Sequence, residues 1–238
     1  LKKKFGIASS KVVIEEFLTG IEISCFVLTD GESYLTLPMA KDYKRIGEGD
    51  TGLNTGGMGA ISPVPFVTKS LRDKIDKKIV QPTIEGLKED GVDYKGFLFI
   101  GLIKVGEEPK VIEYNVRLGD PETEVVLPRI KTDLLSLFRA VQERRLDKVK
   151  LEIDSKVAAT VMAVSGGYPK AYEKGKIITG LENTNMVFHA GTRNEGEDVV
   201  TNGGRVLAAT SFGENFNEAV DKSFKTLKKI NFQGMNYR

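Results

Sequence analysis

Alternating hydrophobic and polar positions predict antiparallel sheet in the first half of the chain. The run "IEISCFVLTDGESYLTLPM" reads as a strand, a turn at Asp30 and Gly31, and a second strand. The apolar run "KVVIEEF" at residues 11–17 predicts another strand just before it. Further on, "GFLFIGLIKV" and "VIEYNVRLG" flank the turn residues "GEEPK" and predict a second hairpin.

Helical spacing of apolar residues predicts three helices. Residues 69–88 form the first, and Pro82 is expected to kink or interrupt it. Residues 132–146 start with a capping residue and form an amphipathic helix, and a last helix is expected near residues 215–229. The predicted apolar side of the second helix carries Leu134, Leu135, Phe138 and Val141.

The pattern changes near residue 150, where short strands such as "AATVMAVSG", "MVFHAGT" and "GRVLAATS" begin. We therefore predict two domains, residues 1–149 and residues 150–238, and an α+β fold class. In this prediction an antiparallel sheet with helices is followed by a small, β-rich α+β domain.

Composition narrows the possible ligands. The chain has 238 residues, 40% of them hydrophobic, and its 35 basic and 33 acidic residues leave a net charge of +2. Because no stripe of Lys and Arg alternates with aromatic residues, we expect no nucleic acid partner. No apolar run approaches the ~20 residues of a membrane span, so no membrane is expected. A single cysteine, Cys25, allows no disulfide within the chain and fits a cytoplasmic location, and the start at Leu1 is typical of a fragment or processed product.

Residues 47–63 contain six glycines and are predicted to form no regular element. Three of these glycines match G-x-G-x-x-G, but no apolar strand precedes them and no helix follows, so the dinucleotide-binding motif is excluded. The Walker A spacing also occurs without its lysine. A glycine-dense loop preceded by Lys44 and Arg45 can still present backbone N–H groups to an anion. The alternative, a long surface connection, stays open.

The run "VIEYNVRLG" places Glu113, Asn115 and Arg117 at every second position, and therefore on one face of a strand. Mg²⁺ prefers oxygen ligands and takes one or two of them from protein, which a Glu and an Asn can supply. A forked arginine beside them suits phosphate or carboxylate, and the acidic run "GDPETE" follows. The alternative is a solvated face of an edge strand.

Several blocks resemble the phosphoribosylamine–glycine ligases, also called glycinamide ribonucleotide synthetases, of the ATP-grasp superfamily. They are "VVIEEFLTGIEIS", "KDYKR", "DTGLNTGGMGAISPVP", "VIEYNVRLGDPETE", "GGYPKAYEKGKIITG", "VFHAGT" and "TNGGRVL". The resemblance runs in order along essentially the whole chain. It implies the second ATP-grasp subdomain and the C-terminal domain of such an enzyme, with the N-terminal half absent.

The resemblance also implies an activity. Such enzymes join glycine to 5-phosphoribosylamine through a glycyl phosphate while ATP becomes ADP and phosphate, in de novo purine biosynthesis. ATP and Mg²⁺ or Mn²⁺ are the implied cofactors, and the absent N-terminal half of the enzyme is the implied partner, without which the chain is expected to be inactive. Two alternatives stay open: another ATP-grasp carboxylate–amine ligase, and a non-catalytic nucleotide-binding remnant.

By the same resemblance, residues in the matching blocks acquire roles. The implied ATP-binding residues are Glu15, Glu16, Leu18 and Glu22. The implied metal ligands are Glu113 and Asn115, and the implied catalytic residues are Lys44, Arg117 and Asp120. The implied substrate-binding residues are Arg45, Asn54, Thr55, Gly56, Gly57 and Met58. The chain departs from the family in having Leu53 where proline is usual.

Overall fold

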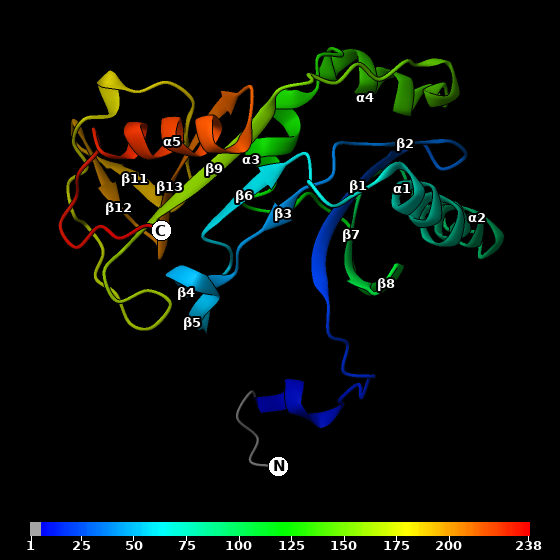
Figure 1. Ribbon diagram of the computed structural model, residues 1–238, viewed down its shortest axis with the longest axis horizontal. Coiled ribbons are helices and arrows are strands. Elements are labelled where there is room, and N and C mark those ends of the chain that lie inside the picture. The colour runs from blue at the N-terminus through cyan, green and yellow to red at the C-terminus, as the bar shows by residue number, and fades with distance from the viewer. Residues whose placement is uncertain (1–5) are drawn as a thin grey trace.

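The computed structural model describes residues 6–238 and contains two larger antiparallel sheets (Figure 1). The first, in spatial order, consists of β2 (Tyr34–Thr36), β1 (Ile21–Thr29), β7 (Gly96–Val105) and β8 (Glu108–Asn115). The second consists of β10 (Val187–His189), β13 (Arg205–Gly213), β9 (Val157–Val164), β6 (Gly59–Ser62) and β3 (Lys41–Asp42). With the helices that cover them, these sheets confirm the predicted α+β class. Across residues 6–238, each helix is too short or too polar to cross a bilayer.

Both predicted hairpins are confirmed, as β1–β2 and β7–β8. The helix predicted at residues 69–88 is also present, as α1 (Lys69–Ile75) and α2 (Gln81–Glu89) joined by the π-helical turn Asp76–Val80. Pro82 lies in the first turn of α2, where its missing N–H is tolerated, and the irregular turn comes just before it.

One face of the first sheet packs against α1 and α2. Alternate residues of β1, namely Ile23, Cys25 and Val27, are buried there against Leu71 and Ile75. Burial, aided by the negative charge of Asp76, raises the pKa of the Cys25 thiol to about 12. Cys25 is therefore a neutral core residue and not a nucleophile.

The opposite face of the same sheet is divided into an apolar end and a polar end. Phe26 and Leu28 lie at the apolar end, packed against α3 (Thr123–Val126) and α4 (Leu134–Gln142). The rings of Phe26 and Phe99 are 5.0 Å apart there. Because side chains alternate along β1, the residues that continue this face toward the start of the strand are the polar Ser24 and Glu22.

The second sheet combines strands from distant parts of the sequence. β6 pairs with β9, so that Gly59 lies opposite Val161 and Ser62 opposite Ala158. Helix α5 (Phe216–Leu227) covers one face of the sheet (Figure 1). The predicted domain boundary at residue 150 thus falls between strands of one sheet, and it stays a prediction.

The prediction that residues 47–63 form no regular element is wrong. They contain the end of a small hairpin, β4 (Arg45–Gly47) with β5 (Thr51–Asn54), and all of β6. Gly49 and Gly52 have positive φ angles of 64° and 83°, which lets the hairpin turn back. A further hairpin that the sequence pattern did not predict joins β11 (Thr192–Glu195) to β12 (Asp198–Thr201). The 3-10 turns are Gly6–Ser10, Glu48–Asp50, Leu127–Arg129, Leu146–Lys148 and Leu181–Asn183.

The strand predicted at residues 11–17 is also absent. This segment runs away from the sheet as irregular chain (Figure 1), and Ile14 and Phe17 are each 92% exposed. A strand needs a neighbour for its backbone hydrogen bonds, and no segment of residues 6–238 pairs with this one.

The helix predicted at residues 132–146 is present but shorter, and its buried side differs from the predicted one. Asp133 caps α4 by accepting a hydrogen bond of 2.7 Å from the Ser136 amide. Leu137 is fully buried, whereas Leu135 is 75% exposed. The predicted apolar side was therefore wrong in including Leu135, because apolar side chains occur on both sides of this helix.

This helix supplies a matched test of the packing. Leu137→Ala should lower the free energy of unfolding by about 2–5 kcal/mol, because it leaves a cavity beside Val125 and Val126. Leu135→Ala removes the same atoms from an exposed site and should cost less than about 0.5 kcal/mol. Equal losses in urea denaturation would contradict the observed orientation of α4.

Candidate functional site

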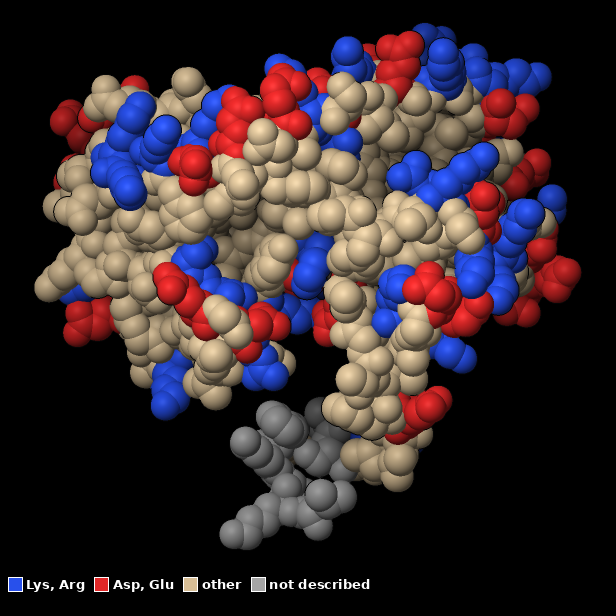
Figure 2. Space-filling model, viewed as in Figure 1, with Lys and Arg blue, Asp and Glu red and all other residues tan. Residues whose placement is uncertain are grey.

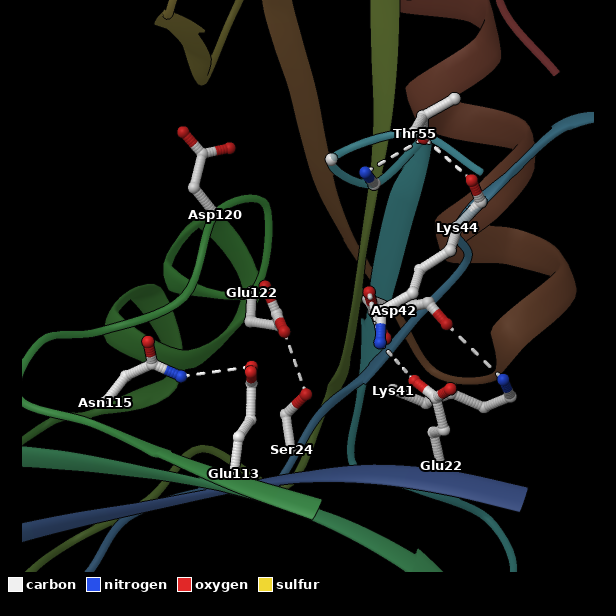
Figure 3. Close-up of polar contacts among 12 residues, drawn as sticks. Glu22, Ser24, Lys41, Asp42, Lys44, Thr55, Glu113, Asn115, Asp120 and Glu122 are labelled. Atoms are coloured by element: carbon white, nitrogen blue, oxygen red, sulfur yellow. Dashed lines mark hydrogen bonds and ion pairs between the residues drawn. The ribbon is translucent and has the colours of Figure 1, made fainter. Parts of the chain in front are cut away.

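The polar end of the first sheet gathers carboxylate, amide and hydroxyl side chains in one place. Ser24 of β1 lies opposite Gly101 of β7, which in turn lies opposite Glu113 of β8. Figure 3 shows Glu113, Ser24 and Glu22 on the same side of the strands. A Cβ atom at Gly101 would lie 3.0 Å from Cγ of Glu113, so the glycine makes room for this carboxylate.

Glu113 and Asn115 lie next to each other, as the alternation predicted. The Nδ2 atom of Asn115 donates a hydrogen bond of 3.1 Å to Oε1 of Glu113. The prediction that Arg117 continues this strand face is wrong, because β8 ends at Asn115. Arg117 is exposed beyond the strand, and its Nη1 atom donates to the carbonyl of Leu118 at 2.9 Å.

A second group of charges faces these residues from the segment after β2. Lys44 forms an ion pair with Glu22, and its Nζ atom is 4.0 Å from Oδ2 of Asp42. Burial acts against the charged form of Lys44, but the two carboxylates outweigh it and raise the pKa of Lys44. Burial raises the pKa of Asp42, although Lys44 opposes this. Lys44 therefore holds a firm positive charge at this position.

Glu122 lies between Glu113 and Asp42 (Figure 3). It is 4% exposed and accepts a hydrogen bond of 2.8 Å from the Ser24 hydroxyl. Burial, followed by the charge of Asp42, raises the pKa of Glu122. The raised pKa values of Asp42 and Glu122 mean that negative charge is unfavourable here, and a bound cation would stabilise the charged carboxylates.

Some of the residues implied for ATP and substrate line two adjoining hollows. Glu15, Glu16 and Leu18 line a hollow of about 450 Å³ together with Ile103 and Ile112. A second hollow of about 480 Å³ is lined by Lys44, Arg45 and Asn54. Glu22 lines both. Each has the size of an ordinary small-molecule site, and Figure 2 shows charges of both signs around the concave middle of this face.

The glycine loop at residues 54–58 is held by hydrogen bonds within the protein. Its amides donate to the Lys44 carbonyl from Thr55, to the Tyr168 hydroxyl from Gly56, to the Thr55 hydroxyl from Gly57, and to the Tyr43 carbonyl from Met58. With these N–H groups already satisfied, the loop does not form the anion-binding nest of amides considered from the sequence. It would offer side chains, such as that of Asn54, to a ligand.

The remaining implied residues are farther from the hollows. Met58 is 1% exposed and packs against Met162 and Val164, so its side chain anchors the loop. Asp120 is half exposed, and its Oδ1 atom lies 3.1 Å from the Nη1 atom of Arg205. The structure thus places Glu22, Lys44, Arg45 and Asn54 together, Glu113 with Asn115, and Asp120 with Arg205.

Four polar residues of this region were not assigned roles from the sequence: Ser24, Asp42, Glu122 and Arg205. Ser24 carries a local signal, since it is a polar residue two positions from Glu22 in an otherwise apolar strand. No such signal exists for Arg205, because only the pairing of β6 with β9 and of β9 with β13 brings it here.

The donor set suits a hard divalent cation. Among residues 6–238 no three His, Cys, Asp or Glu side chains are grouped as metal ligands. A carboxylate and a neighbouring amide nevertheless supply the one or two oxygens that Mg²⁺ takes from protein. Rotation of the Asn115 amide would place its oxygen beside Glu113, where a bound cation would stabilise both oxygens.

Comparisons with known proteins place these features in a family. The family model described as "Phosphoribosylglycinamide synthetase, ATP-grasp (A) domain" matches residues 1–123, and the one described as "Phosphoribosylglycinamide synthetase, C domain" matches residues 158–238. The chain is similar to the phosphoribosylamine–glycine ligase of Chlorobaculum tepidum, with 48% identity over 97% of this chain and 55% of that protein. It is 50% identical to the bifunctional purine biosynthetic protein PUR2,5 of Pichia angusta, over 98% of this chain and 30% of that one.

A solved structure supports the same family. The crystal structure of phosphoribosylamine–glycine ligase from Thermotoga maritima superposes with a TM-score of 0.83 at 39% identity, over 94% of this chain and 56% of that one. The chain therefore spans about half the length of the bacterial relatives and less than a third of the Pichia protein.

Glu124 gives a test of the electrostatics behind this site. Its Oε2 atom is buried without a hydrogen-bond partner, and burial, followed by the charge of Asp120, raises the pKa of Glu124 to about 7. Between about pH 4.5 and 7 the folded chain keeps this proton while the unfolded chain releases it, so stability falls as pH rises. Glu124→Gln should therefore gain about 2 kcal/mol relative to the parent across this window, after allowance for partial exposure.

Urea denaturation at several pH values measures this difference. Glu197→Gln, on the exposed turn between β11 and β12, is the matched control for loss of a carboxylate. A constant difference between the Glu124 variant and the parent across the window would show that Glu124 titrates normally.

Proposed function

The chain belongs to the phosphoribosylglycinamide synthetase family, and from that premise we propose that it forms part of an enzyme that joins glycine to 5-phosphoribosylamine. In this reaction ATP becomes ADP and phosphate, as part of de novo purine biosynthesis. One observation supports the proposal most strongly. The proposed oxygen ligands Glu113 and Asn115 lie on the same side of the sheet as Glu22, which forms an ion pair with Lys44.

ATP would occupy the two hollows. Adenine, a flat apolar ring with polar edges, suits the hollow between Leu18 and the side chains of Ile103 and Ile112. Glu22 stands between this hollow and the next, where its carboxylate can accept hydrogen bonds from ribose hydroxyls. Glu15 and Glu16 line the adenine side, and the phosphates would extend toward Lys44 and Arg45.

Glu113 and Asn115 would hold Mg²⁺ or Mn²⁺, and Glu122 faces the same space. When bound, the cation would neutralise charge on the phosphate oxygens. A single carboxylate–amide pair leaves the other coordination positions of Mg²⁺ to water and phosphate, as this ion prefers. Gly101 of β7, which lies opposite Glu113, adds no carboxylate of its own to this face.

The other residues would position anions. The reaction passes through an acyl phosphate: an oxygen of the glycine carboxylate attacks the γ-phosphorus, and ADP leaves. The ribosylamine nitrogen then attacks the acyl carbon, phosphate leaves, and the nitrogen loses a proton. Lys44, Arg45 and Arg117 supply positive charge for these groups, and Asn54, Thr55, Gly56, Gly57 and Met58 form the loop beside them. Asp120 is the carboxylate available to an ammonium or hydroxyl group of a substrate.

Such an intermediate must be shielded from water, because it otherwise hydrolyses. Residues 15–18 line the first hollow, and the exposed apolar side chains of residues 12–17 would need a cover. We infer that the portion of the enzyme that this chain does not span supplies that cover, and that the complete enzyme works in the cytoplasm.

The direct experiment is to assay the chain with and without the complementary portion of a relative. The chain alone, given ATP, Mg²⁺, glycine and freshly prepared phosphoribosylamine, should form no measurable ADP that depends on glycine. Fusion to the portion of the Chlorobaculum tepidum ligase that this chain does not match should restore it.

The acceptor and acid are then varied in the fused enzyme. Activity with another carboxylic acid but not with glycine would indicate a different carboxylate–amine ligase. Nucleotide binding without turnover in the fused enzyme would indicate a nucleotide-binding remnant. Full activity of the chain alone would mean that the active site lies wholly within it and that the proposed division is wrong.

Removal of the metal ligands tests the site itself. In the fused enzyme, Glu113→Gln and Asn115→Leu should each lower kcat at least about 100-fold, while the melting temperature changes by only a few degrees, because both side chains lie on a polar, partly open face. Glu107→Gln, at the exposed turn of the same hairpin, is the control and should keep full activity. Large losses of stability with activity retained would show that the pair is structural.

A further inference from the structure

We infer that Arg205 and Tyr168, both from the C-terminal third of the chain, are positioning residues that hold the glycine loop and the Asp120 turn in register. This inference rests on the proposed function, since it assigns these two loops to substrate binding. It adds a role for residues that lie outside the sheet carrying the metal ligands.

Arg205 connects the two loops through one nitrogen atom. The residue opens β13, and its Nη1 atom donates to the carbonyl of Gly56 at 2.7 Å and to the carbonyl of Asp120 at 2.6 Å. The same atom lies 3.1 Å from the Asp120 carboxylate. Gly56 and Asp120 are far apart in sequence. The guanidinium of Arg205 links their carbonyls by donating a hydrogen bond to each.

Tyr168 also holds the glycine loop. The Gly56 amide donates a hydrogen bond of 2.9 Å to the Tyr168 hydroxyl, so both backbone polar groups of Gly56 are bound by side chains of the C-terminal third. The Tyr168 ring is fixed in turn. A Cβ atom at Gly204 would lie 2.2 Å from its Cδ2 atom, and the Tyr172 ring packs edge-on at 6.2 Å.

The loop and the turn are in close contact. Gly57 has a φ of +121°, and a Cβ atom there would lie 2.4 Å from Cδ of Pro121, next to Asp120. A Cβ atom at Gly56 would lie 3.0 Å from Cζ of Arg205. These contacts give a physical reason for the two adjacent glycines: the loop has to pass between a guanidinium and a proline ring.

A purely structural ion pair would not need this arrangement. The Asp120 carboxylate is half exposed, and an exposed pair of this kind adds little stability. Arg205 instead fixes the positions of two carbonyls at the edge of the site. A shift of about 1 Å in a substrate-positioning group can cost about 100-fold in rate, whereas the fold depends on the strand pairing of β13 and β9.

The test uses the fused, complete enzyme with four single variants and the double variant Arg205→Met with Tyr168→Phe. Arg205→Met removes the guanidinium but keeps the chain length, Arg205→Lys keeps the charge without the fork, and Tyr168→Phe removes only the hydroxyl. Arg193→Met is the matched control, because Arg193 pairs with Glu195 on β11, away from both loops.

Arg205→Met should lower kcat/KM for glycine and phosphoribosylamine about 30–100-fold and change the KM for ATP less than about 3-fold. Arg205→Lys should recover part of the loss, Tyr168→Phe should cost about 3–10-fold, and Arg193→Met should match the parent. In the double variant the two losses should be less than additive, because both residues act on Gly56.

Hydrogen exchange of a peptide containing residues 54–58 gives a readout independent of turnover. Exchange should be faster in Arg205→Met and Tyr168→Phe than in the parent and in Arg193→Met, because the Gly56 amide loses its acceptor or its support. If the unmodified fused enzyme makes no product, the proposed function fails, and exchange alone decides this inference. Unchanged exchange, or equal effects on the KM for ATP and on the KM for glycine and phosphoribosylamine, would overturn the inference.

Discussion

The pairing of β6 with β9 is the contact on which the rest of the arrangement depends. It joins a strand that directly follows the glycine loop to a strand about 100 residues later. Through β9 it brings β13, and with it Arg205, beside Gly56. Burial of the side chains fixes this register, because a slip of one residue would turn every side chain of β6 to the other face. The loop and the strand that stabilises it are thus one structural unit.

A second constraint acts within the first sheet. Strand alternation gives β1 one face of Ile23, Cys25 and Val27, which the helices cover, and another face that changes from Phe26 to Ser24 and Glu22. The sheet therefore uses half of one face for packing and leaves the other half for polar groups. Burial beside that polar half raises the pKa of Asp42 and Glu122, whereas Lys44 keeps its charge through its carboxylate neighbours. Together these effects favour binding of a cation with an anionic ligand.

The spacing of residues along the chain correctly predicted the features that neighbouring residues determine. The β1–β2 and β7–β8 hairpins, the helices around Pro82 and the adjacent placement of Glu113 and Asn115 all follow from spacing and turn residues. The sequence pattern gave wrong predictions where a strand depends on a pairing partner far away in sequence. Residues 11–17 have a strand-like pattern but pair with no strand among residues 6–238, and β6 lies in a glycine-rich stretch whose partner is far along the chain. Leu135 was misplaced because only packing selects which apolar side of α4 is buried.

The candidate site shows the same division. Family resemblance named the residues of the glycine loop, but it could not show that their amides are already bonded within the protein, nor that Met58 serves as an anchor. Arg205 lies in the quoted run "TNGGRVL", yet its role is visible only when the two sheets are assembled.

We propose that the polar face of the first sheet binds a metal–nucleotide complex. A crystal structure of the fused enzyme with Mn²⁺ and a non-hydrolysable ATP analogue tests it directly. We expect an anomalous peak at about 2.1 Å from oxygens of both Glu113 and Asn115, with the adenine beside residues 15–18. A metal bound to the nucleotide with neither side chain in reach, or a nucleotide outside the two hollows, would contradict it.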